Sequence, residues 1–277
     1  MKIKVLLNLL VLSVATNLYG QQTLSGVIKD QVSNKPVPFV NIGVVNRGTG
    51  TVSNESGQFE WKLDRDFQND TIRISSIGYE SRSFTVSEFI DAIRKDSVIG
   101  LKEQIIELEV IVVSGREFKE KNLGKETSSG MMRGGFRNAE LGNEVGTKIS
   151  VKQSSIMIEK FHTYVTANTN QNLKFRLNFY DLKDGMPNQK LISENIIFPI
   201  DIEEGAFTLD LTDYDIVIDE DFVVSVELVE KEGEKEHMVF FSVAPFGNVM
   251  TRLTSQAAWE KVGGMGIGFN LTVKYEK

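Results

Sequence analysis

The chain contains no cysteine, and it has 2 histidines among 277 residues. The absence of cysteine excludes disulfides, so the folded protein depends on its hydrophobic cores for stability. It also excludes the bacterial lipoprotein route, which needs a cysteine directly after the signal. Neither His162 nor His237 begins an H-x-x-E or H-E-x-x-H pattern, and these are the patterns of zinc enzymes. We therefore expect no zinc centre and no cofactor.

Motifs for nucleophilic catalysis are also missing. There is no G-x-S-x-G sequence, and His162 on a polar face and His237 in a charged turn both read as solvated. A phosphate loop is suggested by four closely spaced glycines, which are Gly263, Gly264, Gly266 and Gly268. They lead into a strand pattern and not a helix, so we predict a turn and close strand packing there. We expect that the protein is not an enzyme.

An excess of positive charge is lacking too. The net charge is −7 and the sequence pI is about 5.1, which argues against nucleic acid as a partner because such binding relies on Lys and Arg neutralising phosphates. No run of like charge reads as a polybasic membrane patch. No apolar stretch of 18 or more residues follows the first twenty, so we expect no transmembrane helix there.

The first 20 residues differ in composition from the rest of the chain. Lys2 and Lys4 precede the apolar run VLLNLLVLSV, and Gly20 ends the segment with a small residue. A basic start, an apolar core of about ten residues and a small final residue are typical of a secretory signal peptide. We therefore expect residues 1–20 to be a signal peptide and the protein to be exported.

Residues 21–114 read as short strands separated by turns. TLSGVIK alternates, and DQVSNKPVP supplies turn residues after it. Gly43 lies inside FVNIGVV, where we expect a close backbone approach or a bulge. SEFIDAIRK predicts a short helix capped by Ser87. Seven or so strands at this spacing predict a β-sandwich.

Both periodicities disappear between residues 115 and 142. REFKEKNLGKETSSGMMRGGFRNAELG mixes charges with scattered glycines, and we predict a flexible linker with at most a short ordered piece around Met131 and Phe136. Alternation then returns over residues 143–277, where FVVSVELVE and MVFFSVAPF are apolar on both faces and so predict central strands. At least seven strands predict a second sandwich of jelly-roll type. The expected fold class is all-β.

Four segments of the first predicted domain occur in a characteristic order. They are SGVIKD at residues 25–30, PVPFVNIGV at 36–44, GTGTVSNESGQFEWKL at 48–63 and ISSIGYES at 74–81. This part of the chain resembles the carboxypeptidase regulatory-like domain, a transthyretin-like (prealbumin-like) β-sandwich common in exported proteins of Bacteroidota. In metallocarboxypeptidases such a domain accompanies the catalytic domain and is not itself catalytic. The resemblance covers about a third of the chain and implies an accessory module.

The segment LEVIVVSG at residues 108–115 is similar to the end of this domain in SusC-like TonB-dependent receptors, where a plug and a lipid-facing barrel follow. In the remaining residues of this chain the apolar faces point inward, which is the inverse of such a barrel, so the resemblance does not imply a transporter. More weakly, RLNFYD, DLTDYDIVIDEDF and TSQAAWEKV resemble a β-sandwich tail that follows such modules in other exported proteins.

A row of polar residues on one strand is the candidate ligand site. In LKFRLNFYD, Arg176, Asn178 and Tyr180 share the face opposite the apolar residues, beside Tyr164 if the two strands are neighbours. Tyrosine rings, Arg and Asn on an exposed sheet can stack on and hydrogen-bond to a sugar or peptide. Trp259 is a further candidate, as a loop platform. The alternatives are cross-strand pairing on a solvated sheet and, for Trp259, a cap on the open end of the sandwich.

Carboxylates gather in DLTDYDIVIDEDF, which contains Asp210, Asp213, Asp215, Asp219, Glu220 and Asp221. Calcium needs several oxygens within about 2.5 Å, and no EF-hand spacing is present. We favour solvated turn carboxylates over a calcium site.

These observations predict a noncatalytic, exported cell-envelope protein that serves as a binding or scaffold module in the periplasm or on the outer-membrane surface of a Gram-negative bacterium. Its expected partners are a glycan or peptide ligand or another envelope protein. The alternative is an accessory of TonB-dependent uptake that acts through residues 108–115.

Overall fold

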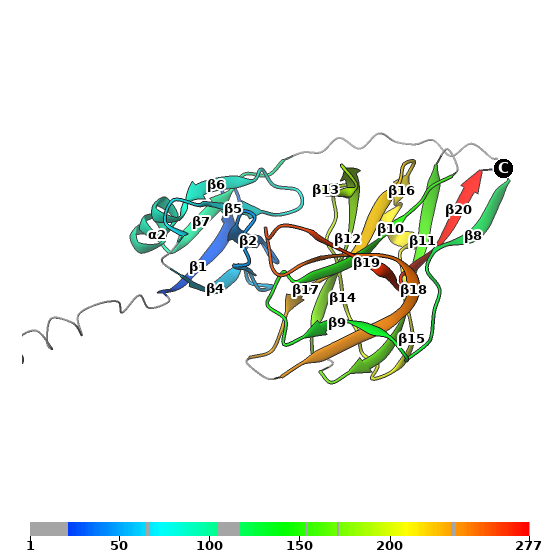
Figure 1. Ribbon diagram of the computed structural model, residues 1–277. Coiled ribbons are helices and arrows are strands. Elements are labelled where there is room, and N and C mark those ends of the chain that lie inside the picture. Colours follow the sequence, from blue (N-terminus) through cyan, green and yellow to red (C-terminus); the bar gives the residue numbers. More distant parts are fainter. Residues whose placement is uncertain are drawn as a thin grey trace, which may run out of the picture.

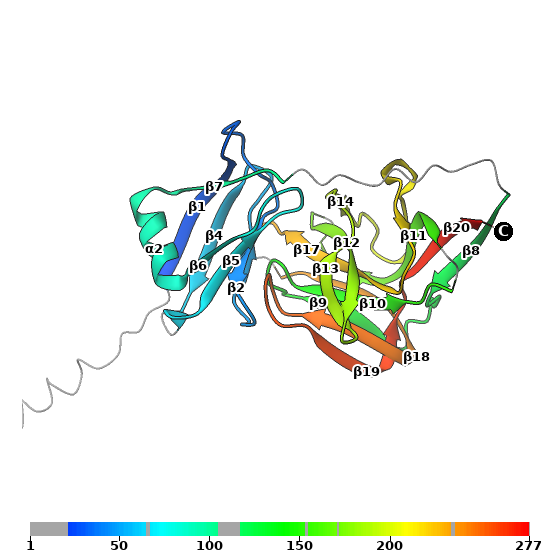
Figure 2. The same cartoon turned by 90° about the horizontal axis from the view of Figure 1, so that it is seen from above.

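The computed structural model describes residues 22–64, 67–104, 117–152, 155–170, 172–233 and 236–276. The predicted signal peptide and the segment LEVIVVSG lie outside these residues. Figures 1 and 2 show two β domains side by side, with one short α-helix in the described part of the chain. The all-β fold class with two sandwich units is confirmed. None of the described helices is long and apolar enough to cross a membrane.

The N-terminal domain is a sandwich of two small sheets. Its strands are β1 (Gln22–Asp30), β2 (Asn41–Val44), β3 (Gly50–Val52), β4 (Gln58–Leu63), β5 (Thr71–Ser75), β6 (Arg82–Thr85) and β7 (Val98–Leu101). One sheet has the order β4-β1-β7 and the other β3-β2-β5-β6. In β4 the side chains alternate strictly between exposed and buried, so Phe59, Trp61 and Leu63 enter the core between the sheets.

Helix α2 (Val86–Lys95) closes one side of this sandwich, where the buried Phe89 packs against the rings of Phe59, Trp61 and Phe84. The prediction that Ser87 caps it is wrong. Thr85 is the N-cap: its hydroxyl accepts from the Glu88 backbone N–H at 3.2 Å, and the Glu88 carboxylate accepts from the Thr85 N–H at 2.7 Å. This reciprocal capping box satisfies two free N–H groups, which places the helix start before Ser87.

The C-terminal domain contains the remaining strands. They are β8 (Phe118–Gly124), β9 (Arg133–Arg137), β10 (Glu144–Ile149), β11 (Ile156–Asn168), β12 (Lys174–Lys183), β13 (Met186–Lys190), β14 (Ile196–Pro199), β15 (Gly205–Asp210), β16 (Val217–Ile218), β17 (Phe222–Glu230), β18 (Met238–Arg252), β19 (Glu260–Ile267) and β20 (Asn270–Glu276), with a 3-10 turn η2 (Thr212–Tyr214). Along the main path the order is β13-β12-β17-β10-β18-β11-β20-β8.

The long strand β18 belongs to both layers of this domain. Its first half pairs with β9 and β11, and its second half pairs with β10 and β19. The two layers enclose one core rich in phenylalanine, in which Phe241 contacts the rings of Phe136 and Phe269. The strands β17 and β18 cross the middle of the domain, as their two-sided apolar sequences predict.

The expectation of a flexible linker over residues 115–142 is wrong for two stretches. β8 pairs along its whole length with β20, and β9 pairs with β18. Neither strand has an alternating sequence: β9 buries Phe136 alone, and no residue of β8 is fully buried. Backbone hydrogen bonds hold these two strands in the sheet. Hydrophobic periodicity in the sequence therefore cannot predict them.

Candidate functional site

The two domains meet where the loop between β18 and β19 lies against β2 and β3 (Figure 1). In this loop the Gln256 carbonyl accepts from the Asn46 backbone N–H at 2.9 Å, and the Gln256 side chain donates to the Ser75 hydroxyl at 2.8 Å. A Cβ added to Gly43 would lie 2.1 Å from the Ser255 carbonyl oxygen, and one added to Gly50 would lie 2.6 Å from it. The close backbone approach predicted at Gly43 is therefore confirmed, and the domains touch through bare backbone.

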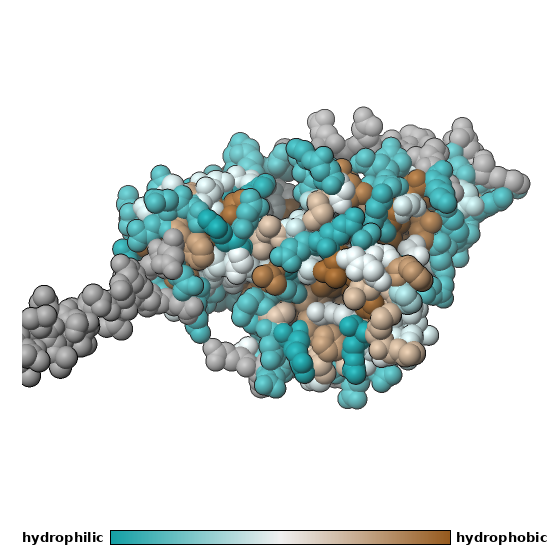
Figure 3. Space-filling view, in the orientation of Figure 1, coloured by the Kyte–Doolittle hydropathy of each residue, from teal (hydrophilic) through white to brown (hydrophobic). Residues whose placement is uncertain are grey.

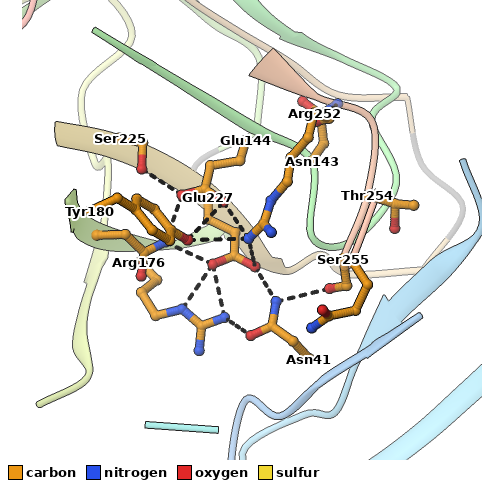
Figure 4. A network of polar contacts seen from close by, with 12 residues as sticks. Asn41, Asn143, Glu144, Arg176, Tyr180, Ser225, Glu227, Arg252, Thr254 and Ser255 are labelled. Atoms are coloured by element: carbon orange, nitrogen blue, oxygen red, sulfur yellow. Dashed lines mark hydrogen bonds and ion pairs between the residues drawn. The ribbon is translucent and has the colours of Figure 1, made fainter. Parts of the chain in front are cut away.

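Beside this contact a buried network of charged and polar side chains crosses the boundary (Figure 4). Arg176 on β12 and Glu227 on β17 are both 0% exposed and form an ion pair of 2.9 Å. Arg176 also donates to the Phe39 carbonyl at 2.8 Å and to the Asn41 side chain. The Asn41 amide in turn donates to Glu227 and, at 2.9 Å, to the Ser255 hydroxyl. Asn41 of the first domain thus completes the bonding of an ion pair in the second.

A second carboxylate, Glu144 on β10, anchors the other half of the network. It accepts from Asn178 at 2.8 Å, from Ser225 at 2.5 Å and from the Tyr180 hydroxyl at 3.3 Å. Arg252 at the end of β18 lies 2.5 Å from Glu144, and its guanidinium lies over the ring of Trp259 at 4.9 Å. Two Arg and two Glu side chains therefore neutralise one another inside the protein, which a buried charge requires.

The electrostatic environment of the network holds its members in defined protonation states. Burial opposes ionisation of Glu227, but Arg176, Lys190 and Arg252 outweigh it and lower the pKa of this carboxyl to about 2. Burial also opposes the charge of Arg252, yet Glu144 and its neighbours raise the pKa of that guanidinium. Burial raises the pKa of Tyr180 well above its usual value. The phenol therefore stays neutral and able to donate.

Lys190 on β13 is the cation whose charge the network does not accommodate. Burial and, after it, the repulsion of Arg176 lower the pKa of this ammonium to about 7. Its Nζ lies 5.9 Å from the centre of the Tyr180 ring. The two carboxylates of the network are already matched by two guanidinium groups, so a third positive charge there is a surplus.

The sequence-based expectation that the row on β12 faces solvent is wrong. Arg176 and Asn178 are 0% exposed and Tyr180 is 3% exposed. The N-terminal domain covers this face through Phe39 and Asn41, and Trp259 packs edge-on against Tyr180 at 5.5 Å. Whether these residues contact a ligand stays a prediction, but in this arrangement of the domains the surface that they would offer is occupied.

Tyr164 does not join this row. It lies half-buried on β11, which pairs with β15, β16, β18 and β20, whereas β12 pairs with β13, β14 and β17. The structure therefore brings together four of the predicted residues, which are Arg176, Asn178, Tyr180 and Trp259, and leaves Tyr164 elsewhere.

Asn41, Glu144 and Glu227 are members of the site that sequence reasoning missed. Ser225 and Glu227 are the polar residues of the otherwise apolar FVVSVELV, and they stand opposite Asn178 and Arg176 in the β12–β17 register. Two polar residues two positions apart in a strand that is apolar on both faces need buried hydrogen-bond partners. This spacing is the sequence feature that could have predicted the network.

The two histidines differ from the solvated side chains that the sequence suggests. His237 is 4% exposed. Its backbone carbonyl and N–H bond at 2.9 Å to the backbone N–H and side chain of Asn138, which lies in the predicted linker. His162 is half-buried and its two ring nitrogens lie 2.9 and 2.8 Å from the hydroxyls of Thr208 and Thr272. Burial, followed by Lys160, lowers the pKa of His162. The imidazole of His162 is therefore held by structural contacts, and His237 is held through its backbone.

The acidic segment holds turns together in the described structure. Asp210 accepts from the backbone and hydroxyl of Thr212 at 3.0 and 2.6 Å, and Asp221 accepts from the Val151 N–H and pairs with Lys148 at 2.6 Å. These bonds lower the pKa of both carboxyls. Within the described residues no three His, Cys, Asp or Glu side chains are grouped as metal ligands.

Open space lies along the domain boundary in two adjoining clefts. The first, of about 700 Å³, is lined by Gly48–Thr51, residues 60–62 and Asp64 of the first domain and by residues around Asn138 and Lys231 of the second. The second, of about 790 Å³, lies between the Asn54–Ser56 turn and Lys174. Lys231 and Gly233 line both, so we call the pair the boundary groove. Figure 3 shows an indentation where the domains meet, on a face that mixes hydrophilic residues with several hydrophobic patches.

Comparison with known proteins identifies the first domain. Residues 24–113 match the family model of the CarboxypepD_reg-like domain, and the match ends before the second domain. The N-terminal sandwich is therefore a carboxypeptidase regulatory-like domain. No curated protein matches the chain.

Similar solved structures include the infectious bursal disease virus VP2 subviral particle, with 9% identity and a TM-score of 0.30 over 95% of this chain and 64% of that one. The Gx strain of the same virus gives 10% identity and a TM-score of 0.27 over 94% and 66%. The chain thus spans slightly less than two thirds of these viral proteins, and scores this low do not indicate a shared fold.

Proposed function

We propose that this protein is a noncatalytic, exported cell-envelope protein whose two β domains form one scaffold for a ligand or partner protein. The observation that carries the proposal is the buried network in which Asn41, Arg176 and Glu227 join the domains. An accessory domain on a mobile tether needs no such contact. A fixed arrangement of two domains, in contrast, gives a boundary groove of constant shape, and domain boundaries are common places for ligands.

Export is supported by the signal-like first 20 residues and by the resemblance of the first domain to exported proteins of Bacteroidota. The chemistry of the site supports a role without catalysis. The charged side chains at its centre are paired and buried, and both ring nitrogens of His162 contact threonine hydroxyls. We place the protein in the periplasm or on the outer-membrane surface.

The test is fractionation of the cells that make the protein, followed by crosslinking and mass spectrometry of the envelope fractions. The proposal expects the processed chain, beginning near Gln21, in the periplasmic or outer-membrane fraction and crosslinked to a partner through residues of either domain. A full-length chain that stays in the cytoplasm would refute it.

The alternative function is a role in TonB-dependent uptake, which the sequence of residues 108–115 suggests. These residues lie outside the described part of the chain, so the alternative stays a prediction. It expects that Ile111→Pro abolishes crosslinking to an uptake partner while both domains keep their thermal stability. Unchanged crosslinking would exclude this route.

A further inference from the structure

We propose that the boundary groove binds an extended, positively charged peptide segment of a partner protein. This inference rests on the proposed function, since it names the ligand class for the same scaffold. Three independent features of the groove support it: the balance of charge on its walls, the strand edges that form one wall, and the lack of an exposed aromatic ring.

The walls of the groove carry a surplus of negative charge. Among the described residues, seven carboxylates line it against three lysines. Two of these lysines are neutralised from nearby: Lys174 lies 3.0 Å from Glu230 and 3.4 Å from Glu55, and Lys231 lies 3.2 Å from Glu140. Glu60, Asp64 and Glu236 are exposed on the walls and form no ion pair with the described residues. A positively charged ligand is therefore the kind that this groove attracts electrostatically.

One wall of the groove is made of strand edges. Among the described strands β4 pairs with β1 alone and β3 with β2 alone, and both line the first cleft. On the side of β4 away from β1, the Gln58 carbonyl accepts from the Asn54 N–H at 2.7 Å, and the Gln58 N–H donates to the Asn54 side chain at 2.9 Å. The Glu60 carbonyl accepts from the Thr51 hydroxyl at 3.2 Å. These bonds come from one turn residue and one side chain, and they do not form a strand ladder. An edge of this kind can accept an extended peptide by strand addition.

Aromatic stacking, which a glycan site uses, is not offered by the described walls. Trp61 lines the first cleft, but it is 4% exposed and its ring packs inward near Phe89. Its Nε1 donates to the Thr49 hydroxyl at 3.2 Å. Without a free ring face, the groove favours a peptide over the glycan that the sequence also suggested.

The test measures binding of a fluorescent ten-residue peptide, in which lysine alternates with threonine, to the chain from residue 21 onward by fluorescence anisotropy. We expect saturable binding that weakens as salt is added, because exposed charges are screened. The variant Glu60→Gln/Asp64→Asn/Glu236→Gln should weaken binding at least tenfold. The matched variant Glu194→Gln/Glu203→Gln/Glu204→Gln removes three exposed carboxylates outside the groove and should bind like the unaltered chain.

A second peptide separates strand addition from simple charge attraction. Replacing its threonines by proline keeps every lysine but removes half of the backbone N–H donors. We expect at least a tenfold loss of affinity. Equal weakening by the two triple variants, equal binding of the proline peptide, or equal binding of a peptide with glutamate in place of lysine would each overturn the inference.

The same titration distinguishes this inference from the proposed function. If a neutral peptide or an oligosaccharide binds and the groove variant weakens it while the lysine peptide does not bind, the ligand class is wrong and the scaffold stands. If fractionation leaves the chain in the cytoplasm, the proposed function fails whatever the peptide does.

Discussion

Glu227 is the residue through which most of the boundary network is connected. It contacts Arg176, Asn41 and Asn178, and it lies 3.8 Å from Arg252. Two charges taken out of water in this way add little net stability as a pair, because their desolvation offsets their attraction. Removing one of them is different, since its partner is then left buried without a counter-charge.

Replacing Glu227 by glutamine tests this asymmetry. Arg176 keeps a hydrogen-bond acceptor but loses its buried counter-charge, so we expect Glu227→Gln to lower the free energy of unfolding by about 3–5 kcal/mol. The measurement is urea denaturation at neutral pH. Glu230→Gln is the matched control, because Glu230 pairs with the partly exposed Lys174, and a loss of no more than about 1 kcal/mol is expected there. Equal losses in the two variants would contradict this account.

The low pKa of Glu227 adds a pH dependence on the acid side. Its folded-state pKa of about 2 lies below the usual 4.5, so the unfolded chain binds this proton more readily than the folded one. The stabilisation is full above about pH 4.5 and is lost as pH falls through 2. Acid denaturation should therefore be shallower in Glu227→Gln over that interval.

Lys190 adds a pH dependence of stability on the alkaline side. Its folded-state pKa of about 7 lies below the usual 10.5, so between these values the unfolded chain holds the proton that the folded chain has released. Stability from this group therefore rises with pH from about 7 to 10.5 and changes no further below 7.

We expect Lys190→Met to be more stable than the unaltered chain at pH 7, because a cation is removed from a site that disfavours it. The variant should also flatten the rise in stability between pH 7 and 10. Urea denaturation at several pH values measures both effects. A parallel pH profile in the two proteins would show that Lys190 is solvated.

At the scale of elements, the start of α2 shows how local bonds fix a boundary that periodicity leaves open. The sequence TVSEF offers two cap candidates, Thr85 and Ser87, and both precede the apolar pair of Phe89 and Ile93. Only Thr85 has a glutamate three residues later, and the structure forms that capping box. The Thr-x-x-Glu spacing was the better guide.

Two single substitutions check this assignment. Thr85→Ala should cost about 0.5–2 kcal/mol of stability, since it leaves the Glu88 N–H without its cap. Ser87→Ala removes a hydroxyl within the first turn and should leave stability within about 0.5 kcal/mol of the unaltered chain. Thermal denaturation followed by circular dichroism measures both. A larger effect at Ser87 would restore the cap expected from the sequence.

The strands differ in how much of them the sequence could predict. Where one face is covered, fully in β4 and partly in β15, alternation alone predicts the strand. β8 and β9 bury almost no side chain, so nothing in their composition separates them from a loop. Alternation also predicts that Arg176, Asn178 and Tyr180 share one face of β12. Whether that face is exposed depends on which other part of the chain covers it. A long-range contact of this kind leaves no periodic signal.

At the scale of the whole molecule, backbone contacts, buried charges and a loop meet at the same place on the domain boundary. The loop at Ser255 and Gln256 contacts β2 and β3, and the Asn41 side chain lies between it and the ion pair of the second domain. Glycine at position 43 makes this approach feasible. The buried ion pair depends on groups from both domains, so separating the domains would expose its charges or leave them without partners. We therefore expect the two domains to unfold together.

The substitution Gly43→Ala tests that coupling. The backbone at Gly43 does not have a positive φ, so alanine suits the strand itself, but its Cβ would lie 2.1 Å from the Ser255 carbonyl oxygen. The loop must move away, at a cost on the order of 1–3 kcal/mol. Calorimetry should show one transition in the unaltered chain and a broader or divided one in the variant, because each domain then unfolds more independently. Gly130→Ala is the control, since no atom lies within 4 Å of its added Cβ, and it should keep the single transition. Two separate transitions in the unaltered chain would mean that the domains are independent and that the boundary groove has no fixed shape.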